Sequence, residues 1–350
     1  MWRTLAFCVV IFWSTFVNGQ PQRPCYFIFG DSISDAGNNN RLITMAKTNY
    51  PPYGVDFPGQ IPTGRFTNGR TIVDVFSELM GFQNSVKTYS NITLLDPDIV
   101  RGVNFASGAA GILPESGSAL GDRVWMDRQL ANYKLILLKL QLMVEGLVKY
   151  YVNRCFYIIT MGSNDYINNY FLPQNYPTSR LFTVQQFARL LRARFRTQLQ
   201  TLYNSGARRV VVFGLGQLGC IPATIARNNA TQCVTEINQA VELFDTQVRS
   251  LVDDFNANLP GARFTFVNIT AIQTANPLPP GFITDSTCCQ LRSDFQCEPN
   301  TPPCADRNIY AFMDGFHPTE IVNQIAATTI FTTQNRDFVG PFSFSELLAN

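Results

Sequence analysis

The sequence predicts an α/β fold, namely a three-layer α/β/α sandwich around a central parallel five-stranded sheet. Two observations favour this fold. Five short, β-rich apolar runs recur along the 350 residues, and segments with a helical period lie between several of them. Strands that alternate with helices form parallel sheets with helices on both faces. With 46% apolar and 15% charged residues, the chain has the balance of a globular domain with a sizeable core.

The elements are expected in the following order along the chain. The apolar runs predict strands over Tyr26–Phe29, Val100–Phe105, Phe156–Thr160, Val210–Gly214 and Phe264–Val267. Apolar residues three and four positions apart predict helices from Ile72 to Met80, from Val184 to Tyr203 and from Ile237 to Phe255. Gly81 ends the first of these helices and Gly206 follows the second. Because no repeat or linker interrupts the pattern, residues 21–350 are predicted to form a single domain.

The first twenty residues are typical of a secretory signal. Arg3 provides a positive charge, Leu5 to Val17 is apolar, and Val17-Asn18-Gly19 resembles a cleavage site. A membrane anchor is the weaker alternative, because a span needs about 20 apolar residues. A second apolar stretch, Leu135 to Leu147, contains Lys139 and Glu145 and is expected to be a buried helix. We therefore expect a secreted, extracellular protein without a transmembrane segment.

Cysteine usage favours the same compartment. Of nine cysteines, Cys8 lies in the signal, which leaves an even number of eight. Zinc is the alternative for the cluster near the C-terminus, but its spacing does not fit and one histidine is present in the chain. Short loops favour pairing Cys220 with Cys233, and pairing within the set Cys288, Cys289, Cys297 and Cys304. No metal is expected.

Surface features also fit secretion. Three Asn-x-Ser/Thr triplets make Asn91, Asn229 and Asn268 candidate glycosylation sites. The formal net charge is +2 and no long basic run is present, so nucleic acid is not an expected partner. The oligomeric state is left open.

Ser32 is a candidate nucleophile. It stands in "CYFIFGDSISDAGNNN", directly after the first predicted strand, and Gly30 permits a tight exit from that strand. Ligands of parallel sheets bind at the carboxyl ends of the strands. The alternative role for Gly-Asp-Ser is an N-cap of the next helix.

A nucleophilic serine needs a base, and His317 is the one histidine of the chain. It stands in "FMDGFHPTE", where Asp314 precedes it by three residues and Pro318 fits the first position of a helix. Asp314 is expected to accept from one imidazole nitrogen while the other faces Ser32. A surface ion pair or a helix cap is the alternative for His317 and Asp314.

The ends of two further strands offer donors for an oxyanion. "GVNFASGAAG" follows the second strand and "ITMGSNDY" the third. We expect the N–H groups of Ser32 and Gly108 and the side-chain amide of Asn164 to form the oxyanion hole. Gly102 and Gly111 are the alternatives to Gly108, and an ordinary turn is the alternative role for each segment.

These motifs resemble those of the plant GDSL-motif esterase/lipases of the SGNH hydrolase superfamily. The resemblance runs from about Cys25 to Phe344 and includes "DFPGQIPTGRFTNGRTIVD" and "HPTE". It places the four family blocks on Ser32, Gly108, Asn164 and the pair Asp314 and His317. Ile33 replaces the leucine of the name motif, and Met313 stands where the family usually has tryptophan.

The resemblance implies an SGNH/flavodoxin-like fold and hydrolysis of carboxylic esters through an acyl-enzyme, without a cofactor. The expected partner is an ester substrate, a lipid or a cell-wall acyl ester, in the apoplast or cell wall. An acyltransferase with the same triad and a catalytically silent binding glycoprotein are the alternatives. In this family the strands that begin after Cys25 and Cys155 are expected to be neighbours, so these cysteines are either a disulfide or two buried thiols. The Pro/Gly-rich stretch from Tyr50 to Asn68 is either part of the cleft or a packed surface loop.

Overall fold

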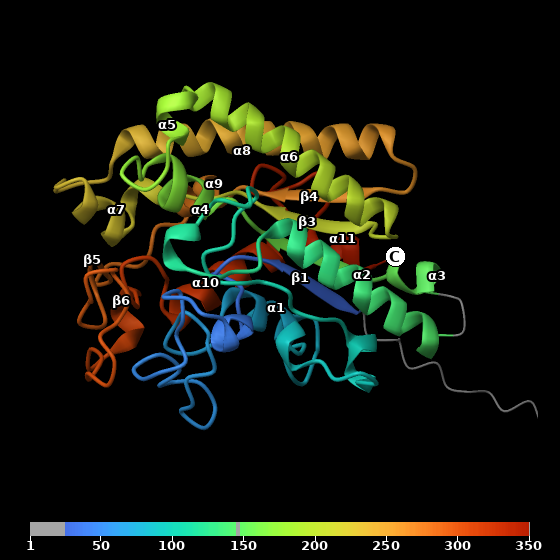
Figure 1. Ribbon diagram of the computed structural model, residues 1–350, viewed down its shortest axis with the longest axis horizontal. Coiled ribbons are helices and arrows are strands. Elements are labelled where there is room, and N and C mark those ends of the chain that lie inside the picture. Colours follow the sequence, from blue (N-terminus) through green and yellow to red (C-terminus); the bar gives the residue numbers. More distant parts are fainter. Residues whose placement is uncertain (1–24, 145–147, 350) are drawn as a thin grey trace, which may run out of the picture.

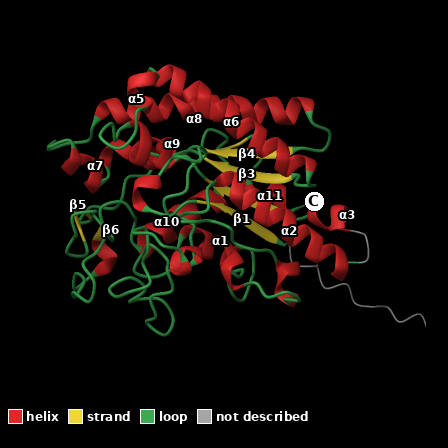
Figure 2. Ribbon diagram, in the orientation of Figure 1, coloured by secondary structure: helices red, strands yellow, loops and turns green. Residues whose placement is uncertain are grey.

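A five-stranded sheet with the order β1-β2-β3-β4-β7 forms the centre of the molecule (Figures 1 and 2). The computed structural model describes residues 25–144 and 148–349. The strands are β1 (Tyr26–Gly30), β2 (Phe156–Thr160), β3 (Arg209–Phe213), β4 (Arg263–Val267) and β7 (Val339–Gly340). The first four are parallel, and β7 pairs antiparallel with β4. The α/β class is therefore as predicted, but the sheet is not wholly parallel.

The side chains of each strand alternate between two hydrophobic cores. On one face, Phe27 and Phe29 pack with residues of α2 (Met126–Met143), α6 (Val184–Asn204) and α8 (Thr235–Asn258). On the other face, Tyr26 and Ile28 pack with residues of α1 (Ile72–Leu79), α9 (Ile269–Ala275), α10 (Glu320–Thr332) and α11 (Phe344–Leu348). This alternation follows from the two-residue period of a strand and produces the three layers of the sandwich.

Three of the helices, α1, α6 and α8, begin and end within three residues of the predicted boundaries. The helices of the structure are α1 (Ile72–Leu79), α2 (Met126–Met143), α3 (Val148–Val152), α4 (Ser163–Asp165), α5 (Thr178–Leu181), α6 (Val184–Asn204), α7 (Pro222–Arg227), α8 (Thr235–Asn258), α9 (Ile269–Ala275), α10 (Glu320–Thr332) and α11 (Phe344–Leu348). The last long helix, α10, begins at Glu320 with Thr319 as its N-cap, so Pro318 precedes the N-cap and the prediction that it takes the first helical position is wrong. Thr71 and Asp74 form a capping box at the start of α1.

The strand predicted over Val100–Phe105 is wrong. Pro97–Arg101 forms a 3-10 helix, and the following residues pair with β1 through a single bridge between Ile28 and Asn104. Gly102 has φ 113°, and a Cβ there would lie 1.9 Å from the carbonyl oxygen of Tyr26. This close, kinked approach prevents a regular ladder, and the two-residue strand β7 is the fifth member of the sheet instead.

Two predictions concern the apolar segments. The signal over residues 1–20 lies outside the described residues. The stretch after Leu135 continues α2 to Met143, where Ile136 and Leu140 are buried but Leu138 and Leu142 are exposed, so the helix is only half-buried. No helix within residues 25–144 and 148–349 has the length and apolar character needed to span a bilayer.

Four disulfides tie the loops together, which fits an extracellular protein. Cys25–Cys155 joins the amino ends of β1 and β2, and Cys220–Cys233 closes a loop before α8. Cys288–Cys304 and Cys289–Cys297 lie between β5 (Ile283–Thr287) and β6 (Tyr310–Phe312), which form a small parallel sheet of their own. Figure 1 shows this sheet beside the blue segment that contains residues 50–68.

Candidate active site

Ser32 lies at the carboxyl end of β1, in the turn that leaves the sheet. The strand must end in glycine, because a Cβ on Gly30 would lie 2.2 Å from Oγ1 of Thr160 on β2. The turn is closed by Asp31, whose backbone carbonyl accepts from the N–H groups of Ser34 and Asp35. Burial raises the pKa of the Asp31 carboxyl to about 7, partly offset by the N–H of Ile33. Ser32 itself is half-buried.

His317 joins Ser32 to Asp314. Its Nε2 lies 2.8 Å from Ser32 Oγ, and its Nδ1 lies 2.8 and 2.9 Å from the two carboxylate oxygens of Asp314. A carboxylate can only accept, so Nδ1 carries the proton and donates it to Asp314. In the neutral ring Nε2 is then the acceptor for the Ser32 hydroxyl. The one histidine of the chain thus lies 285 residues from Ser32 in sequence and in hydrogen-bond contact with it.

The Asp314 carboxylate is fully buried and held from several sides. Its Oδ1 accepts from the backbone N–H groups of Phe316 at 2.8 Å and His317 at 2.9 Å. Its Oδ2 accepts from the hydroxyl of Tyr53 at 2.5 Å. Because of the Asp-x-x-His spacing, one turn presents both the ring nitrogen of His317 and two backbone N–H donors to the Asp314 carboxylate.

Aromatic rings surround the imidazole. The ring centroid of Phe66 lies 4.9 Å from that of His317, and Phe316 packs edge-on at 5.9 Å. Phe66 belongs to the stretch from Tyr50 to Asn68, which is thereby packed against the histidine rather than lying apart from it. His317 is 5% exposed, so little water reaches its ring.

Asn164 lies at the carboxyl end of β2, in the short helix α4. One proton of its amide group is donated to the carbonyl of Ala110 at 2.9 Å, and its Oδ1 accepts from Asn168. An amide nitrogen carries two protons, so one is left for a ligand. The neighbouring Asp165 accepts from the N–H groups of Ile112 and Leu113. These bonds hold the segment that follows Gly108 beside the segment that contains Asn164.

The backbone N–H that was predicted for the oxyanion hole, that of Gly108, has a hydrogen-bond partner within the protein. The N–H of Gly108 donates to Asp35 at 2.9 Å, so in this structure it is already engaged. The next residue, Ala109, has φ 64°, and its N–H has no acceptor among the residues that the structure describes. The same is true of the N–H of Ser32 within the described ranges. Gly102, an alternative to Gly108, packs against the backbone of Tyr26 instead.

The polar residues that follow Ser32 form a hydrogen-bond network that supports this site. Asp35 accepts from the N–H groups of Gly37 and Asn38 as well as from Gly108. Asn39 donates to the Gly108 carbonyl at 3.0 Å. The sequence predicted no role for these residues, although a run of short polar side chains after a buried strand is a usable signal for such a network.

Comparisons with known proteins give the family of this chain. Residues 26–330 match the model of the GDSL-like lipase/acylhydrolase family. The chain belongs to this family. A GDSL esterase/lipase of Arabidopsis thaliana is 43% identical over 338 residues, which cover 94% of this chain and 92% of the relative. A second one from the same plant is 44% identical over 342 residues, covering 95% and 93%.

Membership of the GDSL family, with relatives named esterase/lipases, makes this chain a carboxylic ester hydrolase. The family model begins at the first residue of β1 and ends within α10. It therefore covers every segment that contributes a residue to the site described above.

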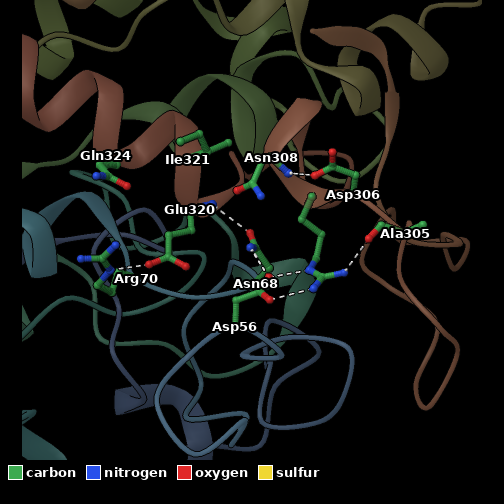
Figure 3. Close-up of a pocket in the computed structure, with 10 residues that line it drawn as sticks. Asp56, Asn68, Arg70, Ala305, Asp306, Asn308, Glu320, Ile321 and Gln324 are labelled. Carbon is green, nitrogen blue, oxygen red and sulfur yellow. Dashed lines mark hydrogen bonds and ion pairs between the residues drawn. The ribbon is translucent and has the colours of Figure 1, made fainter.

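A polar cavity of about 270 Å³ lies beside the start of α10 (Figure 3). Four of its charged side chains form two ion pairs, Arg307 with Asp56 and Arg70 with Glu320, and the carboxylate of Asp306 accepts from the N–H of Asn308. Asn68 donates to Asp56 and accepts from the N–H of Glu320. Because these groups satisfy each other, the cavity is best understood as a clamp that holds the segment 56–70 onto α10.

The three candidate glycosylation sites differ in exposure. Asn91 and Asn229 are exposed, whereas Asn268 is half-buried and its Oδ1 caps α9 by accepting from Ala271. All three stay predictions.

Proposed function

We propose that this protein is a secreted serine esterase in which Ser32, His317 and Asp314 form the catalytic triad. The observation that carries the proposal is the continuous contact from Asp314 through His317 to Ser32 Oγ, with 2.8 Å on each side of the ring. Ser32 attacks the ester carbonyl, and His317 takes its proton and returns it to the leaving alcohol. Water then releases the acid from the acyl-enzyme by the same route. Asp314 stabilises the imidazolium that forms in both steps.

We further propose that the oxyanion is held by the N–H of Ser32, the free amide proton of Asn164 and one backbone N–H of the segment 108–109. Gly108 stays the predicted donor, but it must first release Asp35, whereas Ala109 needs no such exchange. A crystal structure of the protein phosphonylated on Ser32 would separate them. The donor is the N–H that lies within about 3.1 Å of the phosphoryl oxygen.

Secretion and the apoplast belong to the same proposal. They are supported by the predicted signal over residues 1–20 and by the four disulfides. The substrate proposed is a lipid or cell-wall acyl ester.

The test uses the purified protein with Ser32→Ala and His317→Ala variants and chromogenic esters from acetyl to palmitoyl. Each variant should lose on the order of 10⁶ in kcat. Because a protonated imidazole cannot take the proton of Ser32, kcat/KM of the wild type should fall on the acid side. Near-wild-type activity in Ser32→Ala would refute the mechanism. Capture of most of the acyl group by an added alcohol would instead favour an acyltransferase.

A further inference from the structure

The hydroxyl of Tyr53 donates to Oδ2 of Asp314 at 2.5 Å, although the two residues are 261 positions apart in sequence. Tyr53 is 1% exposed and Asp314 is fully buried. The bond therefore lies away from water, where a hydrogen bond to a charged acceptor is strong. Nothing in the motif Asp-x-x-His requires it.

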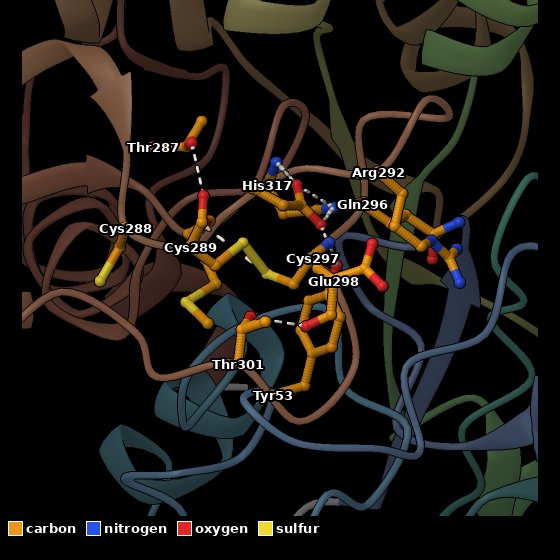
Figure 4. Close-up of a disulfide and its surroundings, with 12 residues drawn as sticks. Tyr53, Thr287, Cys288, Cys289, Arg292, Gln296, Cys297, Glu298, Thr301 and His317 are labelled. Carbon is orange, nitrogen blue, oxygen red and sulfur yellow. Dashed lines mark hydrogen bonds and ion pairs between the residues drawn. A yellow bond between two sulfur atoms is a disulfide. The ribbon is translucent and has the colours of Figure 1, made fainter.

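The direction of the Tyr53 hydroxyl is determined by a second hydrogen bond. The backbone N–H of Cys297 donates to the Tyr53 oxygen at 3.0 Å. A phenol has one proton, and because its oxygen accepts from Cys297, that proton points to Asp314. The Cys289–Cys297 disulfide closes the loop that presents this N–H (Figure 4).

The two oxygens of Asp314 are supported differently. Oδ1 is held by two backbone N–H groups of its own turn, whereas beyond that turn Oδ2 accepts from Tyr53. Rotation of the carboxylate away from His317 is opposed at Oδ2 by the tyrosine. Burial, and next to it the charge of Asp314, raise the pKa of Tyr53 well above its ordinary value, so the hydroxyl keeps its proton throughout the range of activity.

We propose that Tyr53 is a positioning residue for catalysis, which holds the Asp314 carboxylate in the orientation that His317 requires. The inference rests on the proposed triad and extends it by a group from the Pro/Gly-rich segment. Tyr53 does not touch the reacting atoms, so it acts only through Asp314. The stretch from Tyr50 to Asn68 then contributes to the active site from behind, in addition to packing Phe66 on the imidazole.

The test compares Tyr53→Phe with Tyr50→Phe. Tyr50 lies edge-on to Tyr53 at 5.4 Å, but its hydroxyl donates to the Cys297 carbonyl, so Tyr50→Phe removes a hydroxyl from the same cluster and leaves the Asp314 bond in place. We expect Tyr53→Phe to lower kcat about 10-fold or more with KM within about twofold, and Tyr50→Phe to stay within about twofold in both. The acid limb of the pH–rate profile of Tyr53→Phe should move to higher pH, because a carboxylate that has lost a donor attracts the imidazolium more strongly.

A double-mutant cycle with Asp314→Ala separates positioning from packing. If Tyr53 acts through Asp314, Tyr53→Phe should cost no further activity once the carboxylate is absent. An equal loss in both backgrounds would overturn the proposal, as would wild-type kcat and an unchanged pH profile in Tyr53→Phe. Ser32→Ala serves as the reference, since activity in that variant would refute the triad itself rather than the role of Tyr53.

A measurement on the wild type keeps the proposal testable if Tyr53→Phe does not fold. In protein labelled with ¹³C at the tyrosine ζ carbon, slow exchange of a buried hydroxyl appears as two resonances in mixed light and heavy water. We expect such a signal for Tyr53, and its collapse in Asp314→Ala. Fast exchange in the wild type would overturn the proposal, because the hydroxyl would then not be held by the carboxylate.

Discussion

Asn164 is a residue whose polar neighbours determine what its amide can do. Asn168 donates to its Oδ1 at 2.7 Å, which turns the NH₂ group toward the Ala110 carbonyl and the proposed oxyanion position. Asn168 has no such role of its own in the proposed mechanism. The pair therefore offers a graded test of the oxyanion hole.

Asn164→Ala should lower kcat by about 10²–10³, because it removes one donor that acts in the transition state. Asn168→Ala should cost less, since the amide of Asn164 stays present but is no longer oriented. Steady-state kinetics on a short-chain ester measures both. A loss in Asn168→Ala that exceeds that in Asn164→Ala would show that the oxyanion hole is built differently.

Arg65 is the residue that ties the Pro/Gly-rich segment to α1. Its guanidinium makes two hydrogen bonds to the Asp74 carboxylate, at 2.7 and 2.8 Å, and both side chains are buried. Although burial acts against it, the charge of Arg65 holds the pKa of Asp74 well below its ordinary value. Removing the arginine leaves a buried, unpaired carboxylate.

Arg65→Leu should therefore lower the free energy of unfolding by about 3–5 kcal/mol. Arg128→Leu is the matched control, because Arg128 and Asp122 form an exposed pair at 3.0 Å, worth about 0–1 kcal/mol. Equilibrium denaturation with guanidinium chloride gives both values. Equal midpoints for the two variants would contradict the importance of the buried pair.

At the scale of elements, the long periodic helices were predictable and the short pieces were not. The apolar stripes of α6 and α8 run for five turns or more, so their pattern is clear from sequence alone. The strand β7 has two residues, and the bridge at Asn104 has one, which is too short for any period. The segment Val100–Phe105 has strand-like composition, but the contact of Gly102 with the Tyr26 backbone bends it away from a ladder.

Two of the disulfides, also considered at the scale of elements, are expected to differ in their effects on stability and on activity. Cys25–Cys155 closes a separation of 130 residues and lies at the amino ends of the strands, opposite the active site. Cys289–Cys297 closes a separation of only 8 residues, but the backbone N–H of Cys297 donates to the Tyr53 hydroxyl. In the chain-entropy view, the first contributes about 5 kcal/mol and the second about 2.5 kcal/mol.

The double variant Cys25→Ser/Cys155→Ser should therefore lose more stability, and Cys289→Ser/Cys297→Ser should lose more kcat per folded molecule. Denaturation midpoints and steady-state rates at a low temperature, where both variants are folded, measure the two orders. If Cys25→Ser/Cys155→Ser lost more in both measurements, the Cys289–Cys297 loop would support the fold and not the site.

At the scale of the whole molecule, the candidate site was predictable where the chain offers few choices. One histidine and one Gly-Asp-Ser after an apolar strand leave a single way to join base and nucleophile, and the structure brings them within 2.8 Å. Tyr53, Asp35 and Asp165 were missed because tyrosines and aspartates are common and their partners are distant in sequence. The engagement of the Gly108 N–H by Asp35 depends on how two loops pack, which no local pattern reports.

The buried carboxyl groups determine how the stability of the whole molecule changes with pH. Burial raises the pKa of Asp31 to about 7 and that of Asp245 to about 7, the latter partly offset by the N–H of Leu215. In the unfolded chain both titrate near their ordinary value of about 3.9. Between these values the folded state binds more protons, so stability falls as pH rises.

This contribution is fully present below about pH 4 and is lost as pH rises through about 7, by at most about 1.4 kcal/mol per pH unit and group. Asp74 acts in the opposite sense, since the stability from its lowered pKa is lost only in strong acid.

We therefore expect a higher free energy of unfolding at pH 5 than at pH 8, measured by urea denaturation. Asp245→Asn keeps an acceptor for the Leu215 N–H and should flatten this difference. Higher stability at pH 8, or an unchanged pH dependence in Asp245→Asn, would show that these carboxyls do not govern the acid preference of the fold.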